Sequence, residues 1–425
     1  MPFLKNNIQR FYANILPSIL FIYVIIVDSI NGYLQGYYDL HTPIGVITRG
    51  IIFMLLCPVL LKRQFYIVTW LFRCLVYIYI LSIPIWYIVG SQIDLSYELE
   101  YFFKFVYFFT VVLYFYYYRD VFKDVEWLLR LVIYSALIIA TLNVMCFILD
   151  IGIKSYGENY GFGITAFYVD GNSLGLYMIL SNCISVWYAF YKKYIWFIFA
   201  IIITCGTMLI GSRTAVLGVI IVWLSIIIYI LFKHKDIIRM RTSTKVALCI
   251  MVGGVIIYGI VMITHYISTF DTFTAEKFSV ESTISPRKSL IKEGAEIISK
   301  FNIVECLIGN SRSGGISELG ESFLSSGEQK SIEADFHDMI LCFGWFFGGL
   351  MILINIIICW RIISRYIKAP SSLMFSMSLL VILWLAVSYM AGHGFNNPMI
   401  APLIGVVNMI STKVGERDNG RTVVW

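Results

Sequence analysis

Apolar runs long enough to cross a lipid bilayer recur along this chain from Phe11 to Ile410 and are not confined to one end. Of the 425 residues, 59% are hydrophobic and 14% are charged, and the mean hydropathy is +0.80. An ordinary soluble domain carries about 25% charged residues. This composition excludes a soluble enzyme and a single anchored domain. The sequence therefore predicts an all-α polytopic membrane protein with no soluble head domain.

The number of membrane spans follows from the length of the apolar runs, because a helix needs about 20 mainly apolar residues to cross the hydrocarbon core. The first run, Leu16 to Ile30, is followed by further spans and by no evident cleavage site, so we do not interpret it as a signal peptide. We treat residues 1–425 as a single integral membrane domain with about twelve spans. They lie near residues 12–31, 43–61, 65–89, 99–118, 127–149, 170–190, 194–211, 213–232, 246–265, 337–359, 372–391 and 396–412.

The orientation of the chain is predicted from its cations. Lys and Arg fall mainly between the apolar runs, and the short loops assigned to the outer side hold only Lys154. Cytoplasmic loops carry an excess of Lys and Arg, so we expect both termini to be cytoplasmic. The net charge of +6 is explained by these flanks, and nucleic acid is not an expected partner. The nine cysteines indicate neither a disulfide framework nor a metal site.

One polar stretch is much longer than any other loop on the outer side. It covers roughly residues 266–335, between the ninth and tenth predicted spans, and loops of this length usually have a function. Ser285-Pro286 is typical of a helix start, and the next apolar residues have helical spacing. We expect a short amphipathic helix at about 286–300, lying on the membrane or covering a cavity. The Gly/Ser-rich segment 309–315 is expected to be mobile, together with the rest of the loop after it.

Four ionisable residues gather where this long loop re-enters the membrane: Glu333, Asp335, His337 and Asp338. Ionisable side chains at such a depth are costly and are usually functional. If a helix begins here, Asp335 and Asp338 lie on one face, because they are three residues apart. Capping is the alternative, since acids in a first turn complement the helix dipole. Three acids with a histidine exceed what capping requires, which favours a catalytic site.

Four cations are candidates for holding an anion on the outer side. Arg213 lies between two apolar half-stretches, in the turn Gly211-Ser212-Arg213, and either reaches the interface or meets an anion. Arg287 and Lys288 lie in the first turn of the expected loop helix, where the dipole disfavours cations. Arg49 falls near the outer end of its span. For Lys288 alone, a solvated position is equally plausible.

Two further outer loops contain polar residues. Asp170 or Asn172 begins a predicted span, and N-capping is the favoured interpretation. His393 lies between Gly392 and Gly394 at the outer end of the eleventh span, where a histidine can titrate near neutral pH or donate a hydrogen bond. Glycine and proline would mark a turn here with or without chemistry, so both interpretations of His393 stay open.

Taken together, these features resemble the Wzy-type O-antigen polymerase and O-antigen ligase superfamily of bacterial inner-membrane glycosyltransferases. The resemblance covers nearly the whole chain by topology, although its motifs are short. It rests on about twelve spans, a long outer loop late in the chain, the Gly211-Ser212-Arg213 turn, the Arg287 segment leading to Leu307-Ile308-Gly309, and Glu333-x-Asp335-x-x-Asp338 followed by Gly344.

The resemblance implies a GT-C-type enzyme with its active site at the periplasmic face. Such enzymes take a glycan linked through pyrophosphate to undecaprenol and transfer it to a sugar hydroxyl. A polymerase extends another lipid-linked repeat unit, and a ligase transfers polymer to lipid A core. Ligases carry a His-Asn pair where this chain has His337-Asp338, which favours a polymerase. No metal or cofactor is implied, and a chain-length regulator is conceivable as a further partner.

The chemistry of this reaction assigns roles to the candidates. The pyrophosphate leaves as an anion, so cations that stabilise its charge should matter most. Arg213 and Arg287 are the first choices, followed by Arg49 and Lys288. The incoming hydroxyl needs a general base, for which the candidates are Asp335, Asp338, Glu333, His337 and His393. A polysaccharide flippase is the alternative from another class, but it predicts inverted repeats and charges at the bilayer midplane.

Overall fold

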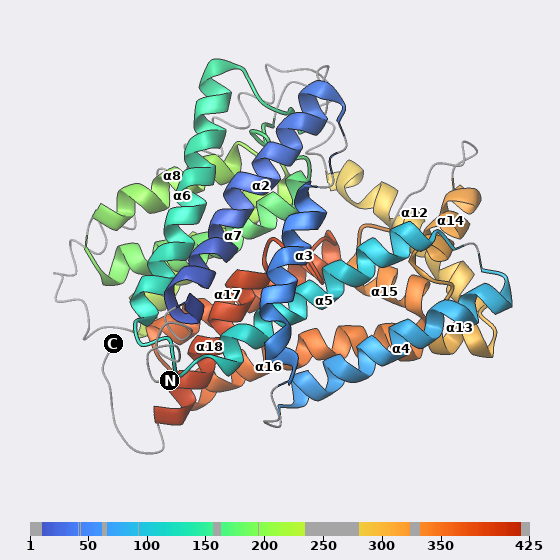
Figure 1. Cartoon of the computed structure of the whole chain (residues 1–425). Helices are drawn as coiled ribbons and strands as arrows, with labels where there is room; N and C mark the ends of the chain where they lie inside the picture. The colour runs from blue at the N-terminus through green and yellow to red at the C-terminus, as the bar shows by residue number, and fades with distance from the viewer. Residues whose placement is uncertain are drawn as a thin grey trace.

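The computed structural model describes residues 11–40, 42, 44–61, 66–91, 93–155, 163–193, 195–233, 280–323 and 332–417 (Figure 1). In these ranges the chain forms helices and no named strand. The elements, in chain order, are η1 (Phe11–Ile15), α2 (Leu16–Tyr38), α3 (Ile44–Leu56), η2 (Cys57–Leu61), α4 (Ile67–Val89), α5 (Leu95–Tyr117), α6 (Val125–Leu149), α7 (Gly171–Tyr191), α8 (Ile195–Met208), α9 (Arg213–Lys233), α12 (Val280–Ser299), α13 (Ile303–Ile308), α14 (Arg312–Phe323), α15 (Asp335–Phe343), η3 (Gly344–Gly348), α16 (Gly349–Lys368), α17 (Ser372–Met390) and α18 (Ala401–Arg417).

In the described part of the chain, nine helices are long and apolar enough to cross a membrane. The prediction of an all-α polytopic membrane protein is therefore confirmed. Two of the other predicted spans correspond to shorter apolar helices, Ile195–Met208 and Ala401–Val414. The predicted span 246–265 lies outside the described residues, so the count of twelve stays a prediction.

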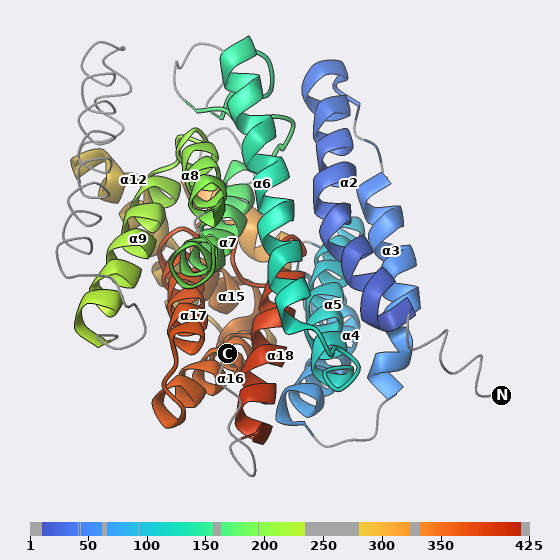
Figure 2. The same ribbon diagram turned by 90° about the vertical axis from the view of Figure 1, so that its left-hand side faces the viewer.

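The helices pack around α7, whose apolar window is 94% buried. It contacts α6, α8, α9 and α17, and α18 packs along α5. In Figure 2, α8 and α9 lie on one flank of the bundle, and α2 and α3 lie on the opposite flank. The span over Ile44–Leu61 is only 22% buried, so α3 leaves most of its apolar surface on the outside of the bundle. A lipid environment suits such a surface.

One end of the bundle collects cations, aromatic rings and both described ends of the chain. The Arg361 guanidinium lies 4.8 Å from the Tyr66 ring centroid and 5.1 Å from that of Tyr116. The Tyr114 hydroxyl donates to the Tyr12 carbonyl, and Lys413 Nζ donates to the Phe122 carbonyl. The first and last described helices therefore meet at the α5–α6 turn.

The opposite end of the bundle holds a polar cavity, to which the first turns of α5 contribute. The 23 residues of α5 connect the two ends, a length of roughly 35 Å at 1.5 Å per residue. This length matches a hydrocarbon core of about 30 Å. Figure 1 shows α12 and α14 gathered at the cavity end of α5.

The described part of the long loop is helical. The expected amphipathic helix is present as α12, but it begins at Val280, so the predicted start at Pro286 is wrong. Leu290 and Ile297 are buried against Leu319 and Ile332. The apolar face of α12 therefore packs against the protein, in contact with α14 and α15.

The prediction that segment 309–315 is mobile is also wrong, because Arg312–Phe323 forms α14 and its first turn is buried. The small residues serve close packing. A Cβ on Gly315 would lie 3.2 Å from Cys342 Cα. On Gly344, which has a φ of +72°, it would lie 2.4 Å from the Glu305 carbonyl oxygen. Glycine at these positions lets α13 and α14 rest directly on the break between α15 and α16.

Candidate active site

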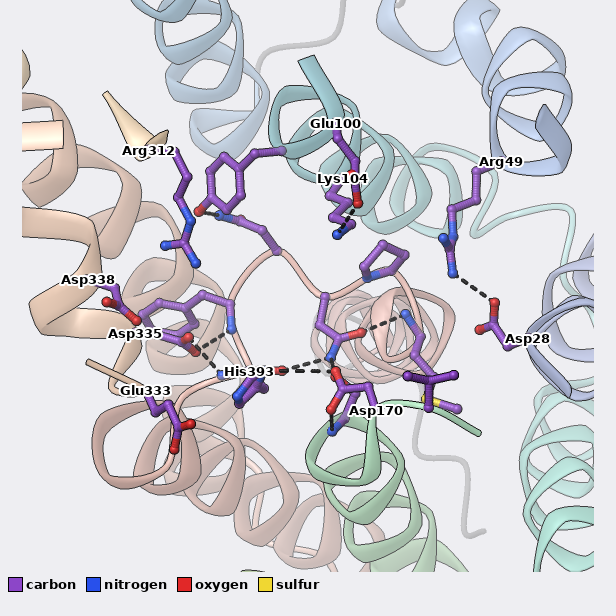
Figure 3. Close-up of a pocket in the computed structure, with 18 of the residues that line it drawn as sticks. Asp28, Arg49, Glu100, Lys104, Asp170, Arg312, Glu333, Asp335, Asp338 and His393 are labelled. Carbon is purple, nitrogen blue, oxygen red and sulfur yellow. Dashed lines mark hydrogen bonds and ion pairs between the residues drawn. The ribbon is translucent and has the colours of Figure 1, made fainter. Parts of the chain in front are cut away.

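The polar cavity, at the end of the bundle opposite Arg361 and Lys413, has a volume of about 330 Å³. It is lined by α2, α3, α5, α14 and α15 and by the segments before α7 and α18. Figure 3 shows its charged side chains facing one another across the space. The ionisable residues labelled there are Asp28, Arg49, Glu100, Lys104, Asp170, Arg312, Glu333, Asp335, Asp338 and His393.

The structure brings together five of the residues predicted from the sequence: Glu333, Asp335, Asp338, His393 and Arg49 all line the cavity. The predicted helix start is also found, because α15 begins at Asp335 and places Asp335 and Asp338 on the cavity side. The two carboxylates are both more than 90% buried, but their surroundings differ.

Asp335 has both oxygens occupied by backbone donors. Oδ1 accepts from the His393 N–H at 2.8 Å, and Oδ2 accepts from the N–H groups of Gly394 and Phe395, each at 2.7 Å. The turn approaches α15 closely, since a Cβ on Gly392 would lie 2.8 Å from the Glu333 carbonyl carbon. Because both oxygens already accept bonds from this turn, Asp335 holds the turn in place and is less free to accept a proton from a bound molecule.

We expect Asp335→Asn to destabilise the protein. An amide has one acceptor oxygen, so at least one N–H of the turn would lose its partner, and hydrogen bonds to a charged group contribute about 1.5–3 kcal/mol each. Thermal unfolding in detergent should show a lower midpoint than in the wild type. Asp150→Asn is the matched control, because the Asp150 side chain is 83% exposed. Equal midpoints for the two variants would contradict this role.

Asp338 also lines the cavity, and it accepts fewer backbone bonds than Asp335. Its Oδ1 accepts from the Ile332 N–H at 3.0 Å, and its carboxylate also accepts a backbone bond from Ala334. Of the two acids on this face of α15, Asp338 is therefore the better candidate to accept a proton from a bound molecule.

Arg312, the first residue of α14, lies on the same side of the cavity as Asp338 (Figure 3). Its guanidinium lies 4.9 Å from the Tyr101 ring centroid. Within the described ranges its Nε has no hydrogen-bond partner, and no carboxylate forms an ion pair with it. Burial lowers the pKa of the Arg312 guanidinium, but nearby Cys342, Asp338 and Tyr101 outweigh this and raise the pKa above its ordinary value. Arg312 is thus a charged group that can bind an anion.

The position of Arg312 depends on a buried carboxylate on α5. Glu98 is fully buried, and its Oε1 accepts from the Ser313 N–H at 2.6 Å and from the Ser313 hydroxyl at 2.8 Å. Its Oε2 accepts from the Tyr79 hydroxyl at 2.9 Å. Trp86 Nε1 donates to the Gly309 carbonyl at 2.8 Å. These bonds join the start of α14 to α4 and α5.

Sequence reasoning missed both Arg312 and Glu98. The Gly/Ser-rich context of Arg312 indicated a mobile loop, and Glu98 lies just before a predicted span with no neighbour in sequence that marks it. A signal for Arg312 was present, because an arginine among small residues can reach a site that bulkier neighbours would close.

His393 occupies the floor of the cavity beside the start of α7. Its Nδ1 lies 3.8 Å from Asp170 Oδ2. Asp170 caps α7 by accepting from the Asn172 and Ser173 N–H groups, which confirms the capping interpretation. Asn397 Nδ2 donates to Ser173 Oγ at 2.6 Å and to the His393 carbonyl at 2.7 Å. This network fixes the turn that carries His393.

The far edge of the cavity holds two ion pairs. Arg49 Nη2 lies 2.8 Å from Asp28 Oδ1, so these two residues form an ion pair. Lys104 Nζ lies 2.6 Å from Glu100 Oε1, one turn away on α5. In Figure 3, Lys104 lies between Arg312, on the Asp338 side of the cavity, and Arg49, on the far side.

The remaining predicted residues are not brought to the cavity. The His337 ring packs 5.9 Å from Tyr389, and His337 is not among the lining residues. Arg213 begins α9 after the predicted hairpin turn, but it does not line the cavity either. The side chains of Arg287 and Lys288, in the first half of α12, lie outside the described part of the structure.

In the described ranges, no group of three or more His, Cys, Asp or Glu side chains is arranged to hold a metal ion. No protein-family model matches the chain, and a search of curated proteins finds no significant match.

Proposed function

We propose that this protein is a membrane glycosyltransferase that joins lipid-pyrophosphate-linked oligosaccharide repeat units, as in the Wzy-type O-antigen polymerases that its sequence resembles. The observation that carries the proposal is the pair formed by Asp338 and Arg312 in one cavity. Asp338 is a buried carboxylate that lines the cavity and accepts fewer backbone bonds than Asp335, and Arg312 is a buried cation whose Nε has no hydrogen-bond partner among the described residues. Transfer of a glycan from a pyrophosphate requires one group of each kind.

In the proposed reaction, a sugar hydroxyl of the acceptor attacks the anomeric carbon of the donor glycan. The new bond joins this oxygen to the anomeric carbon, and the bond from that carbon to the pyrophosphate oxygen breaks. The Asp338 carboxylate takes the proton of the hydroxyl. Arg312 stabilises the negative charge that develops on the departing pyrophosphate, as a preorganised cation does in a site that excludes water.

We assign the other lining residues to binding. Glu333 and His393 lie on the Asp335 side of the cavity (Figure 3) and are suited to hydrogen bonding with sugar hydroxyls. Lys104 and Arg49 add positive charge toward the other edge. A role of Arg213, Arg287 and Lys288 at the pyrophosphate stays a prediction without support from the geometry.

The proposed location is the bacterial inner membrane, with both termini cytoplasmic and the cavity at the periplasmic face. Support comes from the charge at the two ends of the bundle. The end that gathers Arg361 and Lys413 lies opposite the cavity, and the cation-rich side of a membrane protein is normally the cytoplasmic side.

The test is a reaction of the purified protein in nanodiscs with synthetic undecaprenyl-pyrophosphate repeat units. A ladder of products that each differ by one repeat is the expected result. Transfer only when lipid A core is added would identify a ligase instead. Movement of the intact lipid-linked unit across the bilayer, with no new glycosidic bond, would identify a transporter.

A further inference from the structure

A second, smaller cavity opens on the outside of the bundle between α3 and α5. Its volume is about 100 Å³, and its apolar lining comes from Val46, Gly50 and Phe53 on α3 and from Phe103 and Tyr107 on α5. Val46 is 52% exposed and Phe103 is 48% exposed. A Cβ on Gly50 would meet no atom within 4 Å. This space, the α3–α5 groove, therefore lies on a surface that a bilayer would cover.

The α3–α5 groove adjoins the polar cavity at a charged edge. Arg49, Glu100 and Lys104 line both spaces. Arg49 Nε is buried and has no hydrogen-bond partner in the described part of the chain. The Lys104 side chain is 41% exposed. An apolar groove that leads to two cations fits a molecule with a hydrocarbon chain and an anionic head.

We propose that the α3–α5 groove holds the isoprenoid chain of a polyprenyl pyrophosphate, whose lipid-side phosphate lies at Lys104 and Arg49. This inference rests on the proposed function and specifies how the substrate reaches the site. Lys104 is one helical turn from Tyr101, over which Arg312 lies. The second phosphate, which carries the glycan, can then meet Arg312 and bring the reacting carbon to the side of Asp338. The substrate enters sideways from the bilayer, between α3 and α5.

The two cations favour a polyprenyl pyrophosphate over a lipid that has no anionic head group. Each of the two cations already has one carboxylate partner, Asp28 for Arg49 and Glu100 for Lys104. A pyrophosphate can take up the remaining donors of both cations and link them. A neutral lipid would leave these donors unused and gain only apolar contact.

The experiment measures binding of undecaprenyl pyrophosphate to the purified full-length protein in nanodiscs. Gly50→Trp fills the groove, and we expect it to weaken binding by about tenfold, the loss that corresponds to two methylene groups denied their contacts. Ile51→Trp is the matched control, because Ile51 lies on the same helix, is 58% exposed and does not line the groove. Binding of inorganic pyrophosphate to Gly50→Trp should equal that of the wild type, which would show that the cations remain in place.

A second pair of variants tests the head group. Lys104→Met should weaken binding of undecaprenyl pyrophosphate, whereas Lys154→Met should not, since Lys154 lies in the segment after α6 and lines neither cavity. Equal affinity of the wild type, Gly50→Trp and Lys104→Met would overturn the inference. If the wild type forms polymer and Gly50→Trp binds and reacts normally, the α3–α5 groove does not bind the isoprenoid chain, but the proposed function is retained. If binding depends on the groove but no polymer forms, the proposed function is excluded, but the assignment of the groove is retained.

Discussion

Asp338→Asn is expected to lower the rate of polymer formation by roughly 10²–10⁴-fold, the range typical of losing a general base. The asparagine keeps the size of the side chain, and its oxygen can still accept the Ile332 N–H bond that Oδ1 now makes. What it loses is the ability of the carboxylate to take the proton of the acceptor hydroxyl. Initial rates with the synthetic lipid-linked repeat unit measure the effect.

Two comparisons separate loss of the base from loss of structure. The Asp338→Asn variant should bind undecaprenyl pyrophosphate with nearly wild-type affinity, because Asp338 touches the acceptor and not the lipid. Asp150→Asn, at the exposed end of α6, should keep the full rate. A normal rate for Asp338→Asn would exclude Asp338 as the base and leave Glu333 and His393 as the candidates in the cavity.

The membrane architecture was predictable from the sequence because lipid imposes a strict rule. Every backbone N–H and C=O in the hydrocarbon region needs an internal partner, so spans appear as uninterrupted apolar helices. Local signals were equally informative. Asp170 caps α7 as its spacing indicated, and the turn at Gly211-Ser212 separates α8 from α9, with Ser212 Oγ accepting the Ala215 N–H at 3.1 Å.

The division of roles between Asp335 and Asp338 was not predictable, because it depends on contacts between distant segments. The spacing of three residues placed both acids on one helix face, but it could not indicate which one the 393–395 turn would occupy. The partners of Asp335 are 58 to 60 residues away in the sequence. The Glu98–Ser313 bonds that position Arg312 join residues 215 positions apart.

Composition was misleading in the segment that carries Arg312. Glycine and serine are frequent in mobile loops, and their abundance in segment 309–315 predicts mobility there. In the folded protein the small side chains let α14 lie directly on the Cys342 backbone. Glycine and serine occur both in flexible loops and in closely packed helices. Only the contact with a neighbouring helix distinguishes the two cases.

Arg312→Ala is expected to lower the rate of polymer formation by roughly 10²–10³-fold, as when one preorganised group that stabilises a developing negative charge is removed. The guanidinium has an unpartnered Nε in the described part of the chain and forms no carboxylate pair there. It is also held in place, since Tyr101 lies under it and Glu98 anchors the next residue. A cation with a free Nε donor and a fixed position needs little reorganisation as the pyrophosphate leaves.

The Arg312→Lys variant tests whether the planar shape of the guanidinium matters as well as its charge. Lysine keeps the charge but lacks the planar fork that matches phosphate oxygens, so it should restore only part of the rate lost in Arg312→Ala. Because the interaction strengthens as the leaving group gains charge, kcat should fall more than KM rises in both variants. Arg365→Ala, in the last turn of α16 at the cation-rich end, is the matched control and should keep the wild-type kcat. An effect of Arg312→Ala confined to KM would show that Arg312 binds the donor without stabilising its departure.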